Sequence, residues 1–262
     1  MRFFFAIVAA VLLSVPLHGA MSGPVPVKVL LVGDSLSVGG FGATMQEALI
    51  REYGKSNVCV FASCGSSPED WLRGGYVTKC GYRETTPAET ILHQYRNGVR
   101  PRPVKTPKLR ELLARYRPAI AIVQLGTNWM DQLAETRSPA AAHYGKIIRD
   151  FVKELRRNNK NLLVFWVLPP ASSSYPLAVH GQVEGWINAE SRRLGFYTIN
   201  SRSLTAPYRR GKTGGDGVHY NDAAARVWAR YVMNKFSWAL QSLGLADWSS
   251  RGVSSNGRRV SK

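Results

Sequence analysis

Continuous apolar runs alternate with segments of helical periodicity along most of the chain. The runs lie at 27–32, 58–62, 118–125 and 161–168, and a shorter one, FYTIN, covers 196–200. Between them, apolar residues recur every three or four positions, as on one face of a helix. Apolar strands separated by amphipathic helices are typical of a parallel sheet covered on both faces. The pattern predicts an α/β fold, a three-layer sandwich with a central parallel sheet of about five strands.

The sequence shows no internal repeat and no linker between domains, so we expect a single domain. A final helix is expected to start near Asn221 and Asp222, whereas the stretch after 58–62 is interpreted as a long glycine-rich loop. The chain has 262 residues and is 45% hydrophobic, which is enough for one sizeable core. The periods are marked by Val38, Met45, Leu49 and Tyr53; by Leu109, Leu112, Leu113 and Tyr116; by Ile147, Ile148, Phe151 and Leu155; by residues 182–193; and by Val227, Tyr231 and Leu240.

Residues 1–22 have the layout of a secretory signal peptide. Arg2 precedes the apolar run FFFAIVAAVLLSV, which Pro16 and small residues follow. The run is short for a membrane span, and an uncleaved N-terminal anchor is the alternative. We therefore expect an exported protein, periplasmic or secreted, with no stable membrane span after signal removal and one folded domain over 23–247.

Three cysteines agree with export. Cys59 lies in the alternating stretch NVCVFAS and is expected in the core as a small apolar residue. Cys64 and Cys80 lie in irregular glycine-rich sequence, where a disulfide could form in an oxidising compartment, with two free thiols as the alternative. Their spacing matches no metal-site pattern, so we expect no metal.

The chain is strongly basic. Lys and Arg number 35 against 17 Asp and Glu, a net charge of +18, and loss of Arg2 with the signal leaves 34 − 17 = +17. Eight basic residues face the single acid Glu111 between residues 96 and 117. Residues 248–262 hold four more with almost nothing apolar, which predicts a disordered tail. Such a surface favours anionic partners, such as an envelope polymer, or serves solubility alone. Nucleic acid is not expected, because no binding motif is present.

Small and polar residues follow the predicted strands at one edge of the sheet. The segment 33–35, Gly-Asp-Ser, follows the first strand, SCGSS with Gly65 the second, and GTN with Asn128 the third. GGDGVHYN, with Asp216 and His219, lies between the fifth strand and the last helix. Ligands of parallel sheets bind outside the carboxyl ends of the strands. These residues are therefore expected to meet in one site.

Each of these residues also has an ordinary structural role open to it. Asp34 and Ser35 are typical caps of a following helix. Asn128 is a common turn residue, and Asp216 and His219 could form a turn before the last helix. Gly65 is one of several glycines in its region. The order of the whole set therefore carries more information than any member.

That ordered set resembles the motifs of the SGNH (GDSL-type) hydrolase superfamily. Ser35 in GDSLS, Gly65, Asn128 in GTN and His219 in DGVH occur in the order of the family. The resemblance covers roughly residues 27–243. It implies a flavodoxin-like hydrolase domain and a serine esterase that needs no metal or organic cofactor.

The resemblance also assigns roles. A serine hydroxyl is a weak nucleophile until a base takes its proton, and His219 is the implied base for Ser35. Asp216, three residues earlier, would orient the imidazole. The oxyanion of the intermediate would be bound by the backbone N–H groups of Ser35 and Gly65 and by the side-chain amide of Asn128.

Trp71, Tyr76 and Trp129 follow these loops and are the candidate substrate contacts, with ordinary packing as the alternative. Aromatic rings there could stack on sugar rings or on acyl chains. Many relatives carry an acid directly after the GTN asparagine, whereas here Trp129 follows and Asp131 comes later. This departure leaves the catalytic set intact but weakens inferences about substrate.

We therefore predict an exported serine esterase that removes O-acyl groups, foremost O-acetyl, from a carbohydrate or cell-envelope glycan through an acyl-enzyme. The site loops contain small, polar and basic residues with tryptophan and tyrosine, which favours a glycan over a lipid. The alternatives are a lipolytic lysophospholipase or thioesterase, acyl transfer to another sugar hydroxyl, and a non-catalytic glycan-binding protein.

Overall fold

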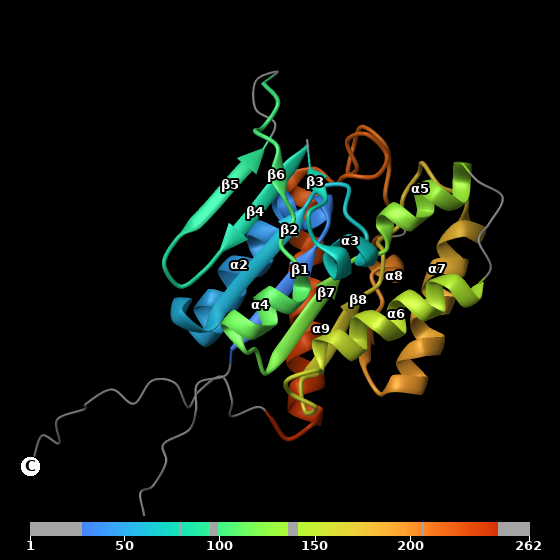
Figure 1. Cartoon of the computed structure of the whole chain (residues 1–262). Coiled ribbons are helices and arrows are strands. Elements are labelled where there is room, and N and C mark those ends of the chain that lie inside the picture. The colour runs from blue at the N-terminus through green and yellow to red at the C-terminus, as the bar shows by residue number, and fades with distance from the viewer. Residues whose placement is uncertain (1–27, 79, 95–98, 136–140, 206, 246–262) are drawn as a thin grey trace, which may run out of the picture.

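The structure is a computed structural model that describes residues 28–78, 80–94, 99–135, 141–205 and 207–245 (Figure 1). The expected signal peptide at 1–22 and the expected tail at 248–262 lie outside the described residues. No helix in the described part of the chain is long and apolar enough to cross a membrane.

A seven-stranded sheet forms the centre of the molecule, in the order β5-β4-β2-β1-β7-β8-β9. The five strands from β2 to β9 are parallel, and their order corresponds to 2-1-3-4-5 along the chain, as in flavodoxin-like sheets. The expectation of an α/β sandwich with about five parallel strands is confirmed. The strands are β1 (Val29–Gly33), β2 (Val58–Ser63), β4 (Gly81–Thr85), β5 (Thr90–Gln94), β7 (Ile120–Gln124), β8 (Leu163–Val167) and β9 (Tyr197–Ile199).

The interpretation of the stretch after β2 as a loop is wrong in part. β4 and β5 extend the sheet beyond β2 as an antiparallel pair. A two-stranded ribbon joins β3 (Val77–Thr78) to β6 (Val104–Lys105). β4 reads GYRET, and its buried Arg83 breaks the apolar pattern by which a buried strand is recognised.

Helices cover both faces of this sheet (Figure 1). The last one is capped by the side chain of Asn221, which accepts a hydrogen bond from the N–H of Ala224, close to the expected start. The helices are α1 (Ser35–Val38), α2 (Gly40–Tyr53), the 3-10 turn η1 (Lys55–Asn57), α3 (Pro68–Arg73), α4 (Leu109–Tyr116), α5 (Thr127–Glu135), α6 (Ala141–Leu155), α7 (Leu177–Leu194), α8 (Arg202–Thr205) and α9 (Asp222–Ser242).

Alternate residues of each strand point into two separate cores. Val29 and Leu31 of β1 belong to the core under α2 and α9, whereas Leu30 and Val32 belong to the core under α3 to α7. Both faces of β1 are therefore fully buried, which explains why its sequence is continuously apolar.

The register of the sheet brings the carboxyl ends of three strands together. Gly33, at the end of β1, pairs with Ala62 of β2 on one side and with Gln124 of β7 on the other. The loops that carry Ser35, Gly65 and Asn128 therefore leave the sheet side by side. This position is where a site is expected in an open parallel sheet.

Candidate active site

Ser35 is the first residue of α1, directly after the central strand. Asp34 caps this helix, and its Oδ1 accepts a hydrogen bond of 3.0 Å from the N–H of Leu36. Of the two possible caps, Asp34 and Ser35, it is therefore Asp34 that caps the helix. Ser35 is left half-buried, with its backbone N–H among the helix-start groups that have no partner within the helix.

Ser35, His219 and Asp216 form a continuous hydrogen-bonded chain. The Nε2 atom of His219 lies 2.8 Å from Ser35 Oγ, and its Nδ1 atom lies 2.7 Å from Asp216 Oδ2. The first of these contacts joins residues that are 184 positions apart in the sequence. Both distances suit transfer of the hydroxyl proton to an imidazole that a carboxylate orients.

Asp216 is held as an anion by its own turn. Burial acts to raise the pKa of this carboxyl, but hydrogen bonds from the His219 backbone, the His219 ring and the Val218 backbone outweigh it and place the pKa below its ordinary value. Its Oδ1 accepts from the N–H of His219 at 2.7 Å and of Val218 at 2.9 Å. The carboxylate therefore stays charged where the imidazole needs an acceptor.

Asn128 and the loop after β2 are joined directly. Asn128 Nδ2 donates a 2.8 Å hydrogen bond to the carbonyl oxygen of Ser66, next to Gly65. Gly65 has φ +82°, and the hydroxyl of Tyr76 occupies the space that a Cβ at residue 65 would need. A glycine is therefore required there both by backbone conformation and by space.

A disulfide joins Cys64 to Cys80 and ties the loop at Gly65 to the start of β4. Thr78 Oγ1 reinforces the tie by donating to the carbonyl oxygen of Cys64 at 2.9 Å. Cys59 is buried as a free thiol within β2. The loop that presents Gly65 is thus fixed by a covalent bond and by its polar neighbours.

The expectation that Trp71 and Trp129 rim the site is wrong. Both side chains are fully buried in the core under α3 to α7. Trp71 Nε1 donates to Ser66 Oγ at 3.0 Å, and Trp129 Nε1 donates to a carboxylate oxygen of Glu69 at 3.0 Å. The two tryptophans face the core from α3 and α5, and their hydrogen bonds hold α3 and the loop before it in place. Tyr76, which is half-buried, remains a candidate contact.

Comparison with known proteins finds solved structures that have a similar fold. No family model matches the chain, and no curated protein matches it. Among solved structures, an acetyl xylan esterase, AlAXEase, shares 17% identity with a TM-score of 0.54 over 80% of this chain and 99% of its own. A carbohydrate esterase family 3 protein from Talaromyces cellulolyticus shares 15% identity, with a TM-score of 0.53 over 82% and 99% of the two chains.

A third solved structure, a peptidoglycan O-acetylesterase, is 12% identical, with a TM-score of 0.55 over 82% of this chain and 92% of its own. The chain shares the α/β fold of these esterases. At these identities the likeness establishes the fold alone, so activity has to be argued from the site itself.

A buried polar layer that the sequence pattern did not reveal lies beside Ser35. Asp34 is completely buried, with Gln124 and Thr127 beside its carboxyl group. Ser37 Oγ donates to Gln124 Oε1 at 2.6 Å. Burial raises the pKa of Asp34 to about 6, against the opposing effects of the Leu36 backbone N–H, of the Gln124 and Thr127 side chains and of the nearby His219 ring.

A buried arginine holds the far end of α1. Arg83 donates from Nε at 3.2 Å and from Nη2 at 2.9 Å to the carbonyl oxygen of Val38, and Gln94 Nε2 donates to the same atom at 3.1 Å. The antiparallel strands β4 and β5 therefore clamp the helix that begins with Ser35. The charged pattern of GYRET was the one signal in the sequence that could have revealed this contact.

Two further features complete the surroundings of the site. Tyr175, on the loop after β8, donates its hydroxyl proton to Asp131 of α5, one turn after Asn128. Among the described residues, no group of three or more His, Cys, Asp or Glu side chains is arranged to hold a metal ion.

Replacement of Trp129 by Ala should destabilise the fold instead of acting on substrate alone. Removing a fully buried tryptophan costs about 3–5 kcal/mol in free energy of unfolding. Urea unfolding of Trp129→Ala measures this loss, and Trp238→Ala is the matched control because Trp238 is 66% exposed on α9. A Trp129 variant as stable as the control would contradict the burial of this ring.

Asp34 should make the stability of the protein depend on pH. A buried carboxyl whose pKa rises from 3.8 to about 6 binds more protons folded than unfolded, so the free energy of unfolding falls as pH rises through 6. Asp34→Asn keeps a capping oxygen and removes this penalty, which is at most about 3 kcal/mol. Urea unfolding at pH 4 and pH 7.5 should show the variant gaining on wild type only at the higher pH. An equal difference at both values would refute this assignment.

Proposed function

We propose that the protein is a serine esterase that works through an acyl-enzyme. The observation that carries this proposal is the hydrogen-bonded chain from Ser35 through His219 to Asp216, with contacts of 2.8 and 2.7 Å. The fold supports this proposal, because open parallel sheets bind ligands outside the carboxyl ends of their strands, which is where Ser35 lies.

In the proposed reaction, Ser35 Oγ attacks the ester carbonyl carbon as His219 Nε2 takes the hydroxyl proton. Asp216 accepts the Nδ1–H hydrogen bond and stabilises the imidazolium that forms. His219 then gives the proton to the leaving alcohol oxygen, and the C–O bond of the ester breaks. A water molecule repeats the sequence on the acyl-enzyme and releases the carboxylic acid.

The negative oxygen of each tetrahedral intermediate needs donors that are already in place. The backbone N–H groups of Ser35 and Gly65 and the Nδ2 group of Asn128 are proposed for this role. Asn128 now donates to Ser66 O at 2.8 Å, which places its amide beside Gly65 and leaves its second hydrogen for substrate.

A small acyl group fits the site best. A cavity that reaches Ser35 and His219 has a volume of about 30 Å³ and is lined by Phe41, Ala225 and Trp228 among other residues. Such a space holds little more than a methyl group. We therefore propose O-acetyl esters of a glycan as substrates, a class to which the printed names of the acetyl xylan esterase and the peptidoglycan O-acetylesterase also point.

One observation favours longer acyl groups as a second possibility. An apolar cavity of about 200 Å³ lies next to the small one, and Tyr220 and Trp228 line both. Tyr220 is fixed in this partition by a 2.6 Å hydrogen bond from its hydroxyl to the carbonyl oxygen of Ala171. The lipolytic alternative therefore requires that this ring be displaced.

Export and attraction to an anionic envelope polymer remain part of the proposal. The disulfide between Cys64 and Cys80 supports an oxidising compartment. The net charge of +18 for the full chain, or +17 without the signal peptide, supports attraction to a polyanion, which salt would weaken.

Ser35→Ala and His219→Ala should each remove nearly all hydrolysis of 4-nitrophenyl acetate while leaving the fold intact. Asn128→Ala should lower kcat on the order of a hundredfold, as loss of one oxyanion donor does elsewhere. Ser56→Ala and His143→Ala, both at exposed positions, are the matched controls. Turnover of Ser35→Ala at the wild-type rate would exclude the serine mechanism.

Acyl-chain preference should depend on Tyr220. The wild-type protein should cleave acetyl esters at least tenfold faster than octanoyl esters, because the cavity at Ser35 is small. Tyr220→Ala should join the two cavities and shift the preference toward butyryl and hexanoyl esters, as a series of 4-nitrophenyl esters can measure. If wild type already prefers decanoyl esters or lysophospholipids, the lipolytic alternative replaces the glycan proposal.

A further inference from the structure

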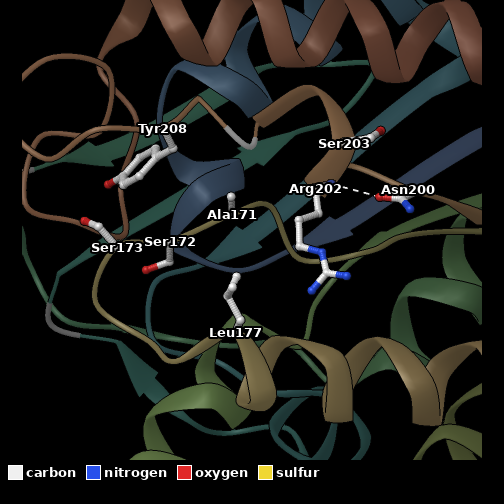
Figure 2. A pocket seen from close by; sticks show the side chains of 8 residues that line it. All are labelled: Ala171, Ser172, Ser173, Leu177, Asn200, Arg202, Ser203 and Tyr208. Atoms are coloured by element: carbon white, nitrogen blue, oxygen red, sulfur yellow. Dashed lines mark hydrogen bonds between the residues drawn. The ribbon is translucent and has the colours of Figure 1, made fainter.

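A larger cavity, of about 410 Å³, opens between the loop after β8, α8 and the loop before His219. Its volume lies within the range of small-molecule sites. The hydroxyl groups of Ser172, Ser173 and Tyr208 stand on one side of it, and the guanidinium of Arg202 lies on the other (Figure 2). Leu177 supplies apolar surface below them (Figure 2). Hydroxyls, one cation and an apolar patch form a surface suited to an acidic sugar.

The cavity is built onto the loop of the proposed active site. Ser172 Oγ donates to the carbonyl oxygen of Gly217 at 2.6 Å, and the N–H of Ser173 donates to the same oxygen at 3.0 Å. Tyr208 donates its hydroxyl proton to the carbonyl oxygen of Gly214. Gly217 directly follows Asp216, so a ligand in the cavity lies beside the catalytic turn.

Arg202 has the geometry of an anion-binding side chain. Its Nη2 atom lies 3.2 Å from Glu184 Oε2, and its side chain is 36% exposed, whereas that of Glu184 is 9% exposed. The ion pair orients the guanidinium from behind and leaves further N–H donors toward the cavity. A guanidinium with free donors on one edge binds a carboxylate in bidentate fashion.

A set of buried polar groups lies against these lining residues. His180 is buried against the backbone of Ser172. The Oε1 atom of Glu184 has no hydrogen-bond partner among the described residues. Burial lowers the pKa of His180 and raises that of Glu184. His180 and Glu184 therefore lie behind the lining residues Ser172 and Arg202 and are not themselves part of the cavity wall.

We propose that this cavity is a subsite for a sugar unit that carries a carboxylate, next to the acylated unit of the same glycan. The carboxylate binds Arg202, and the sugar hydroxyls bind Ser172, Ser173 and Tyr208. A single cation, partly balanced by Glu184, suits a monoanionic carboxylate better than a doubly charged phosphate. This inference rests on the proposed esterase function and narrows its substrate to an acylated acidic glycan of the uronic acid class.

Binding alone provides the first test. Trigalacturonate should bind Ser35→Ala protein at 150 mM NaCl, and its methyl ester, in which each carboxylate is a neutral methyl ester group, should bind at least tenfold more weakly by calorimetry. Adding Arg202→Gln should remove most of this difference. Arg209→Gln, which removes the same charge from an exposed position on the neighbouring loop, should change the affinity less than twofold. Equal binding of both ligands, or equal effects of the two arginine variants, overturns the proposal.

A second variant protects the test against misfolding, since Arg202→Gln leaves the buried Glu184 unpaired. Ser203→Asp places a negative charge at the exposed rim of the cavity without touching that ion pair, and it should also weaken trigalacturonate binding tenfold. Thermal unfolding verifies that each variant is folded. If Ser203→Asp is folded and binds as the parent does, the subsite is wrong.

Measurement of acetate release distinguishes the proposed esterase function from the proposed subsite. With acetylated polygalacturonate and acetylated xylan as substrates, Arg202→Gln should lower the ratio of kcat/KM for the acidic over the neutral polymer about tenfold, mainly through KM. If trigalacturonate binds as expected but no ester is hydrolysed, the esterase function fails and the subsite stands. If esters are hydrolysed without preference for the acidic polymer, the subsite fails and the esterase function stands.

Discussion

The packing of α9 against α2 is the constraint on which the site depends. The rings of Phe41 and Trp228 stack with centroids 3.8 Å apart, and Trp228 Nε1 donates to Ser201 Oγ at 2.9 Å. This contact brings the N-terminus of α9, and the turn with His219 before it, over the start of α1. This packing therefore brings the Ser35 hydroxyl and the His219 imidazole together, although the two residues are 184 positions apart in the sequence.

Ser35 is held in place by polar groups whose burial is unfavourable in free energy. Asp34 caps α1 from a fully buried position, and its raised pKa shows how strongly burial disfavours its charge. Arg83 clamps the other end of the same helix through the carbonyl oxygen of Val38. A four-residue helix has little stability of its own, so these tertiary contacts fix the position of Ser35.

The aromatic residues near the site divide into two groups with different functions. Trp71 and Trp129 stabilise the loops from within, while Tyr220 separates the small cavity at Ser35 from the apolar cavity behind it. Under the proposed function, Tyr220 limits the size of the acyl group, and the hydroxyls and Arg202 of the larger cavity bind the sugar.

The sequence by itself determined the five parallel strands, the covering helices and the four loops that meet at one edge, because burial on both faces requires continuous apolar runs and the period of each helix follows from its geometry. It also indicated the serine, the histidine and the glycine-rich turns, whose residue types serve both capping and chemistry. Tertiary structure alone decided that β4 and β5 join the sheet, that Trp71 and Trp129 point inward, and that Arg202 lies near the turn that carries Asp216 and His219. Each of these depends on contacts between residues far apart in the chain, which no local pattern encodes.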